Sequence, residues 1–116
     1  MRPIKFRGKS IETGKWVEGY LFCSWDKAFI LWGTTAGIPN MVEVDPATVG
    51  QYTGLKDKKG AMIFEGDILS DGAFTYEVRY EGTGFVMILD GQAYTMDTRP
   101  TKIVIGNIHD NPELLK

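Results

Sequence analysis

The chain has 116 residues, a formal net charge of −2, 43% hydrophobic residues and 24% charged residues, which are ordinary values for one globular domain and argue against disorder. Its single cysteine, Cys23, excludes an internal disulfide and a zinc site built from several thiolates. The longest apolar run, residues 28–32, is too short to cross a membrane, so we expect a soluble cytoplasmic protein without a membrane partner.

Short apolar runs separated by glycine-containing turns predict strands throughout the chain. The expected strands are 4–7, 16–25, 28–32, 41–44, 48–53, 66–70, 74–81, 84–90, 93–96 and 102–108. Asp26-Lys27 is expected to reverse the chain into a hairpin, and residues 33–40 to form a mobile loop. Asn111 can cap a one-turn helix that begins at Pro112.

These elements predict an all-β fold of short antiparallel strands in a single domain, 1–116. The N-terminal part, about residues 1–54, reads as a meander. The remainder of the chain, 55–116, reads as a second possible subdomain, whose Gly-Asp-Ile strand entry is typical of small SH3-like barrels.

The central segment QYTGLKDKKGAMIFEGDIL, at 51–69, contains two features that read as turns. Gly54 and Gly60 bracket the charged residues 56–59, whose side chains we expect to be solvated. Asp67, directly after Gly66, can accept backbone hydrogen bonds and fix the entry into the next strand. We therefore interpret Gly54, Gly60, Gly66 and Asp67 as a structural turn motif.

Three blocks, IKFRGKSIETGKWVEG, QYTGLKDKKGAMIFEGDIL and VIGNIHDNPELL, resemble in order and spacing the YopX-like family of phage and prophage proteins. The resemblance covers nearly the whole chain except 26–45 and 70–102. It implies an all-β, oligomeric protein encoded in phage-derived regions of bacterial genomes, and hence a bacterial cytoplasmic location. It brings no catalytic residue and no cofactor to this chain.

Positive charge is concentrated at the N-terminus, where residues 1–15 carry a net charge of +4 against −6 for the rest of the chain. Arg2, Lys5, Arg7 and Lys9 are the candidate contacts to nucleic acid, because Lys5 and Arg7 share one face of the first strand. The favoured interpretation is nevertheless a solubilising edge strand, since lysine discourages unwanted strand pairing. Aromatic residues crowd the segment 16–32, and they could stack on single-stranded bases, although a core or subunit-interface role is the default expectation.

Candidate catalytic groups all have simpler structural interpretations. His109 beside Asp110 could be an oriented base, but a surface histidine is favoured. Cys23, within an aromatic strand, is expected to be a small buried hydrophobe. Glu65, Asp67 and Asp71 could bind Mg²⁺ through oxygen ligands, but turn and packing roles are favoured. The sequence therefore predicts no catalytic, cofactor-binding or metal-binding residue.

Three functions stay open. The favoured one is a non-enzymatic phage accessory module that forms a homo-oligomer and binds a host or phage macromolecule. The second is a nucleic-acid-binding protein that uses the basic N-terminal edge. The third is a metal-dependent hydrolase built on the three carboxylates.

Overall fold

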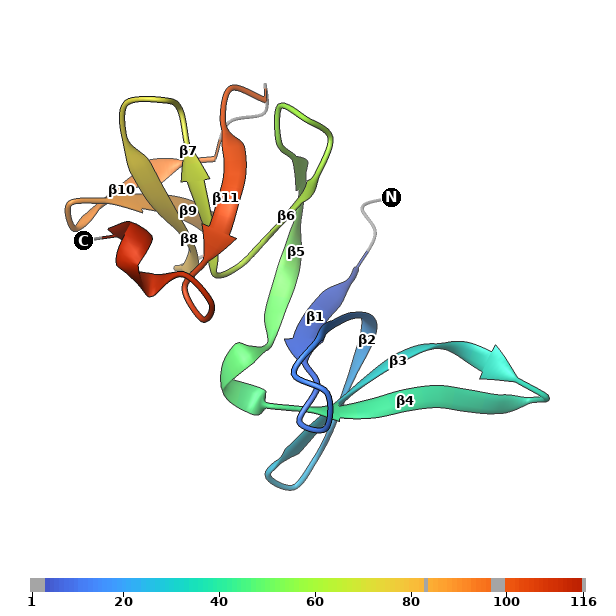
Figure 1. The fold of residues 1–116 in the computed structure, drawn as a ribbon. Coiled ribbons are helices and arrows are strands. Elements are labelled where there is room, and N and C mark those ends of the chain that lie inside the picture. Colours follow the sequence, from blue (N-terminus) through green and yellow to red (C-terminus); the bar gives the residue numbers. More distant parts are fainter. Residues whose placement is uncertain (1–3, 83, 97–99, 116) are drawn as a thin grey trace. The chain divides into compact units, whose positions relative to one another are not determined.

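The computed structural model describes residues 4–82, 84–96 and 100–115 and is all-β with antiparallel pairing, which confirms the predicted fold class (Figure 1). The strands are β1 (Phe6–Lys9), β2 (Trp16–Ser24), β3 (Lys27–Thr35), β4 (Ile38–Val44), β5 (Gly50–Lys56), β6 (Met62–Phe64), β7 (Asp67–Ser70), β8 (Thr75–Glu81), β9 (Gly84–Leu89), β10 (Gln92–Thr95) and β11 (Ile103–Asn107). Two short 3₁₀ helices complete the fold, η1 (Pro46–Thr48) and η2 (Pro112–Leu115). The predicted C-terminal helical turn is thus present as η2.

The strands form a six-stranded sheet with the order β4-β3-β2-β1-β5-β6 and a five-stranded sheet with the order β10-β9-β8-β7-β11. The chain divides into two compact units, Met1–Tyr52 and Thr53–Lys116, and β5 crosses the division. In the first unit β1 to β4 form the predicted meander. The second sheet is open, with β10 and β11 at its edges, so the expected barrel does not close.

The prediction that the first strand lies at a sheet edge is wrong. One side of β1 pairs with β2 from Phe6 to Lys9, and its other side pairs with β5 at Phe6 and Arg7. After η1 the chain returns along the side of β1 that the meander leaves open. That return is a long-range pairing, which the local pattern of residues 4–9 does not encode.

The expected mobile loop at 33–40 is instead the end of a β-hairpin, whose register shifts between Leu31 and Thr34. β3 runs to Thr35 and β4 begins at Ile38, so only Ala36 and Gly37 connect them. Both residues have positive φ, 53° and 80°, the combination of a type I′ turn, whose twist matches that of paired strands. The preceding hairpin turns at Trp25-Asp26, one residue earlier than predicted, and Trp25 has a φ of 58°.

Each unit has its own buried cluster. The first unit buries Ala28, Ile30 and Val44, and the second buries Ile63, Leu69, Val78 and Met87. A β-bulge interrupts the pairing of β11 with β7, where the register shifts between Val104 and Gly106. None of the helices within the described residues is both long and apolar enough to span a membrane.

Candidate functional site

The first unit presents an apolar sheet face to solvent. Side chains alternate along β2, so Val17 and Leu21 pack on the buried cluster while Tyr20 and Phe22 point the other way. Residues paired across antiparallel strands share a face, which extends this surface onto β3 and β4. We call this surface the outer face, and its aromatic and aliphatic members are Trp16, Tyr20, Phe22, Phe29, Leu31 and Met41.

The outer face is substantially exposed. Tyr20 retains 69% of its surface, Phe22 50% and Met41 47%. Phe22 and Phe29 contact each other across the hairpin with ring centroids 6.1 Å apart. The expectation that these aromatics form the core by default is therefore wrong for β2. Apart from Glu18, the alternating residues of both faces of β2 are largely apolar, so the sequence pattern separated the buried face from the solvent face only weakly.

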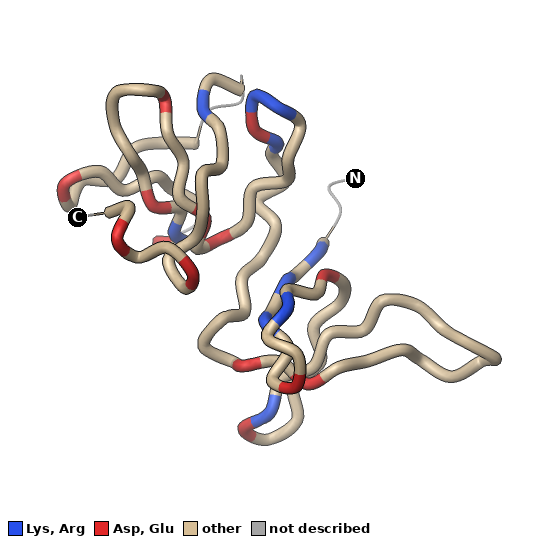
Figure 2. Tube along the Cα trace, viewed as in Figure 1, with Lys and Arg blue, Asp and Glu red and all other residues tan. Residues whose placement is uncertain are grey.

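The predicted basic residues lie on this same face, beside the aromatics. Arg7 is opposite Glu18, and Lys9 is opposite Trp16. The guanidinium of Arg7 lies 4.7 Å from the centroid of the Trp16 ring, and the Lys9 ammonium lies 5.8 Å from it. The Lys5 ammonium is 3.7 Å from a carboxylate oxygen of Glu18. Figure 2 shows the resulting band of positive residues along β1.

These contacts limit what the cations can offer to a ligand. The Lys5–Glu18 pair is 39% and 48% exposed at its side chains, so it contributes little to stability and can open. Cation–π contacts such as those of Arg7 and Lys9 contribute about 0.5–1 kcal/mol or more each, and Arg7 is half-buried with its Nε and Nη2 atoms shielded from solvent. Arg2 lies outside the described residues, so the structure brings together three of the four predicted contacts.

Cys23 is exposed, so the prediction of a buried cysteine is wrong. It is the second-last residue of β2, next to the turn at Trp25, whose side chain is fully exposed. The aromatic residues around Cys23 in the sequence belong mostly to the outer face and therefore do not cover it.

Asp57 is a buried carboxylate that the sequence interpretation missed. Only 4% of its surface is exposed, although we expected all side chains of 56–59 to be solvated. One carboxylate oxygen accepts hydrogen bonds from the N–H groups of Lys59 and Ala61, both at 2.8 Å, and the other accepts from Val104 N–H at 2.9 Å. A signal was present, because Asp followed three residues later by Gly is typical of a type I turn.

The electrostatics of Asp57 follow from these donors. Burial raises its pKa, but the N–H groups of Val104, Ala61 and Lys59 together outweigh burial and hold the pKa below its ordinary value of 3.8. Asp57 is therefore an anion that joins the 57–61 turn to β11. This role is structural, because all three donors belong to the backbone of the same unit.

The turn motif at 54–67 also has a structural arrangement. Asp67 is 1% exposed, and one of its carboxylate oxygens accepts the predicted backbone hydrogen bond, from Phe64 N–H at 2.7 Å. Gly60 and Gly66 adopt positive φ in turns, 85° and 93°. Gly54 also has positive φ, 90°, but it lies inside β5.

The three carboxylates considered for Mg²⁺ do not form a metal site. Asp71 accepts hydrogen bonds from the N–H groups of Ala73 and Phe74 and from the Tyr76 hydroxyl, which stabilise its loop. The donors at Phe74 and Ala73 lower the pKa of Asp71. No group of three or more His, Cys, Asp or Glu side chains within the described part of the chain is arranged to hold a metal ion.

The His109-Asp110 pair lies in the turn after β11. The N–H groups of both residues donate to the Asn107 side-chain oxygen, at 3.0 Å and 2.9 Å. The Asn107 amide in turn donates to the Asp110 carboxylate at 3.3 Å. These contacts explain the His-Asp dipeptide as part of an Asn-capped turn.

The comparisons with known proteins agree with the predicted resemblance. The family model described as YopX protein matches residues 5–116. The crystal structure of protein EF1440 from Enterococcus faecalis is similar over 100% of both chains, with a TM-score of 0.66 and 30% sequence identity. No curated protein matches the chain. With its sequence matched almost from end to end and its fold shared, the chain belongs to the YopX family.

Proposed function

We propose that this protein is a non-enzymatic, phage-derived accessory module that associates with itself and binds a macromolecule through the outer face. The observation that carries the proposal is the exposure of Tyr20, Phe22 and Met41 on one side of three adjacent strands. Contiguous apolar surface of this kind marks interaction sites in soluble proteins. Tyr and Phe at the centre of such a surface supply much of the burial energy of an interface.

The edge of the same sheet supports association through the face rather than by strand addition. At one end of β4, Pro39 has no N–H to donate to a neighbouring strand. At the other end, Val44 bridges to Ser10, and the N–H of Ile11 donates to the carbonyl of Glu43. The edge of β4 is thus protected at both ends, while the outer face is open.

Sedimentation equilibrium at micromolar concentrations tests the proposal. We expect the wild-type protein to have a mass of more than one subunit. The double variant Tyr20→Glu/Phe22→Glu should be a monomer, because it places two carboxylates in the centre of the apolar face. The matched control is Ile11→Glu, a similarly exposed aliphatic residue outside the face, and it should associate like the wild type. A wild-type protein that stays monomeric throughout this range contradicts self-association.

Nucleic-acid binding is a second candidate function, because Lys5, Arg7 and Lys9 share the outer face with Trp16 and Tyr20. Aromatic rings and cations on one sheet surface are typical of single-strand binding. With Arg2 included, four phosphate contacts give a slope of log affinity against log salt near −3 on single strands, from about −0.7 per contact. We expect weak binding that vanishes at physiological salt, because the rest of the chain carries −6 and repels phosphate.

Fluorescence anisotropy with a labelled single-stranded oligonucleotide measures this binding. Micromolar or tighter affinity at physiological salt, lost in Lys5→Ala/Arg7→Ala, would replace the self-association proposal with a nucleic-acid-binding function. Arg7→Lys is the control that keeps the charge at this position.

A further inference from the structure

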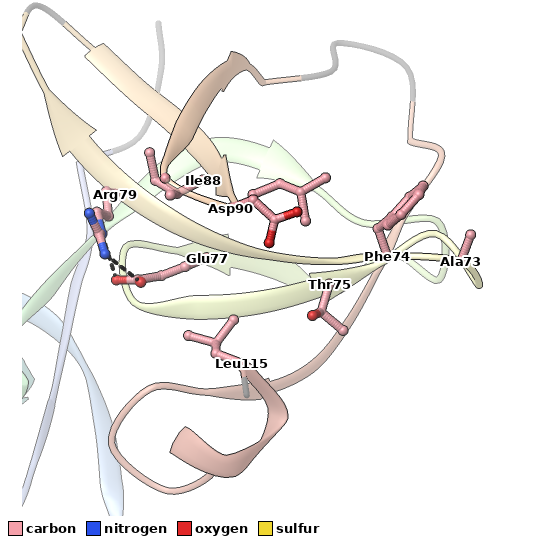
Figure 3. A pocket seen from close by; sticks show the side chains of 10 residues that line it. Ala73, Phe74, Thr75, Glu77, Arg79, Ile88, Asp90 and Leu115 are labelled. Carbon is pink, nitrogen blue, oxygen red and sulfur yellow. Dashed lines mark hydrogen bonds and ion pairs between the residues drawn. The ribbon is translucent and has the colours of Figure 1, made fainter.

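The second unit contains an open groove between η2 and the sheet face formed by β8 and β9. Its volume is about 590 Å³, and residues that line it include Phe74, Glu77, Arg79, Ile88, Asp90 and Leu115. Figure 3 shows Leu115 of η2 facing the β8 side chains, with Asp90 at the end of β9 and Phe74 at the start of β8. The groove lies on the face of β8 opposite to Val78, which belongs to the buried cluster.

Two carboxylates, Glu77 and Asp90, and one cation, Arg79, line the groove. Arg79 donates two hydrogen bonds of 2.9 Å to the carboxylate of Glu77, and another of its nitrogens lies 3.8 Å from Glu81. The hydrogen bonds to Glu77 and the charges of Glu77 and Glu81 raise the pKa of Arg79, so Arg79 stays a cation whose charge is paired with these carboxylates. Asp90 adds a further carboxylate at the end of the groove. A ligand in the groove therefore meets more negative than positive charge.

The walls of the groove are apolar and open to solvent. Phe74 is 56% exposed and Leu115 is 38% exposed, and both line the groove. Walls this exposed do not enclose a small molecule, which normally has most of its surface buried in its site. They are suited to side chains that protrude from another protein surface.

The outer face of the first unit has the complementary chemistry. It combines protruding aromatic side chains with three cations, Lys5, Arg7 and Lys9, and two carboxylates, Glu18 and Glu43, whereas the groove combines apolar walls with two carboxylates and one cation. The two units also differ in charge as a whole, because residues 1–52 contain six basic and five acidic residues and residues 53–116 contain seven and ten. Opposite charges on two patches favour their contact over contact between like patches.

We infer that the outer face of one copy docks into the groove of a second copy, with Tyr20 and Phe22 against Phe74 and Leu115 and the cations of β1 toward Asp90. This inference rests on the proposed self-association and specifies its geometry. The contact joins two different surfaces, so each copy has one face and one groove to offer. Such a heterologous contact forms a ring or a chain of subunits, whereas contact between two outer faces stops at a dimer.

Mixing two defective variants tests this geometry. The face variant is Tyr20→Glu/Phe22→Glu, and the groove variant is Asp90→Asn/Leu115→Lys. Asn tolerates the positive φ of 52° at position 90, so the turn is kept. We expect each variant alone to sediment as a monomer. An equimolar mixture should give a species of two subunits and nothing larger, because only one intact face and one intact groove meet.

The control for the groove variant is Glu113→Lys, which changes the charge by the same two units in the same 3₁₀ helix but does not line the groove. It should associate like the wild type. Thermal unfolding followed by circular dichroism verifies that each variant is folded. If the double groove variant is unfolded, Asp90→Asn alone replaces it, with at least a threefold rise in the dissociation constant as the expected result.

The outcomes separate the two proposals. If folded groove variants associate like the wild type while the face variant is monomeric and is not rescued in the mixture, the outer faces pair with each other. That result overturns the docking inference and leaves the proposed function intact. If the wild-type protein is itself monomeric, both proposals are wrong.

Discussion

Asp57→Ala should strongly destabilise the protein, because this carboxylate accepts three backbone hydrogen bonds in a site that is only 4% exposed. Hydrogen bonds to charged groups contribute about 1.5–3 kcal/mol each. The loss should be smaller than the sum of three such contributions, since Lys59 and Ala61 are exposed and water can replace the carboxylate at their N–H groups. The Val104 N–H is half-buried and loses its partner more completely. We therefore expect a loss of about 2–4 kcal/mol, a large share of the ~5–15 kcal/mol that stabilises a typical domain.

Urea denaturation followed by circular dichroism measures this loss. Asp57→Asn should also destabilise, because its amide has one acceptor oxygen and must direct an NH₂ group at one of the N–H donors. Lys58→Ala, an exposed change in the same turn, should stay within about 0.5 kcal/mol of the wild type. A loss below about 0.5 kcal/mol in Asp57→Ala would refute the argument that this carboxylate joins the turn to β11.

The pH dependence gives an independent check. The folded state holds the pKa of Asp57 below 3.8. The ionised carboxylate therefore stabilises the fold fully at pH values above the pKa that Asp57 has in the unfolded chain. This contribution is lost as the pH falls through the folded pKa. The difference in the free energy of unfolding between wild type and Asp57→Ala should therefore be constant above about pH 5 and shrink on acidification below pH 4.

Two further changes test the other local contacts. Asp67→Ala should cost about 1–2 kcal/mol of stability, because it removes the carboxylate that accepts the hydrogen bond from Phe64 N–H. Millimolar Mg²⁺ should leave the melting temperature of the wild type unchanged. A rise of several degrees with Mg²⁺ that Asp67→Ala abolishes would instead favour the metal-dependent hydrolase. Gly106→Ala should cost about 1–3 kcal/mol of stability, since an added Cβ would lie 2.6 Å from the Asn111 side-chain oxygen. Asn111→Gly in the same chain should recover part of that loss. Equal stability of Gly106→Ala and the wild type would contradict this close approach.

Strand positions could be predicted from the sequence, because apolar residues bounded by glycine-containing turns recur along the whole chain. The side of the sheet that would be buried could be predicted only weakly for β2. Val17 and Leu21 on one face and Tyr20 and Phe22 on the other are all apolar, so Glu18 is the one charged residue of β2 whose polarity indicates the solvent face. The pairing with β3 determines which face of β2 is buried, since Ile30 and Ala28 of β3 lie on the same face as Leu21 and are buried.

Long-range pairing was the second limit on prediction. The side chains of Lys5 and Arg7 were correctly placed on one face by alternation, but the position of β1 between β2 and β5 depends on a partner more than forty residues away. Asp57 shows the same limit within the second unit. Its turn is recognisable from Asp57 and Gly60, whereas its burial depends on Val104, which the sequence places far from it.

A recognisable sequence motif is not by itself evidence of a chemical function, as the block QYTGLKDKKGAMIFEGDIL illustrates. Its two buried aspartates, Asp57 and Asp67, accept backbone hydrogen bonds that hold turns in place. Burying a carboxylate is costly unless such donors are present, so replacing either aspartate should destabilise its turn. These two residues of the block therefore have structural roles. The surfaces available for function are the outer face and the groove, and most of their residues lie in segments 16–45 and 70–102 or at the C-terminal turn, largely outside that block. Variants of those surfaces, rather than of the block, are the ones that will alter binding while leaving the fold intact.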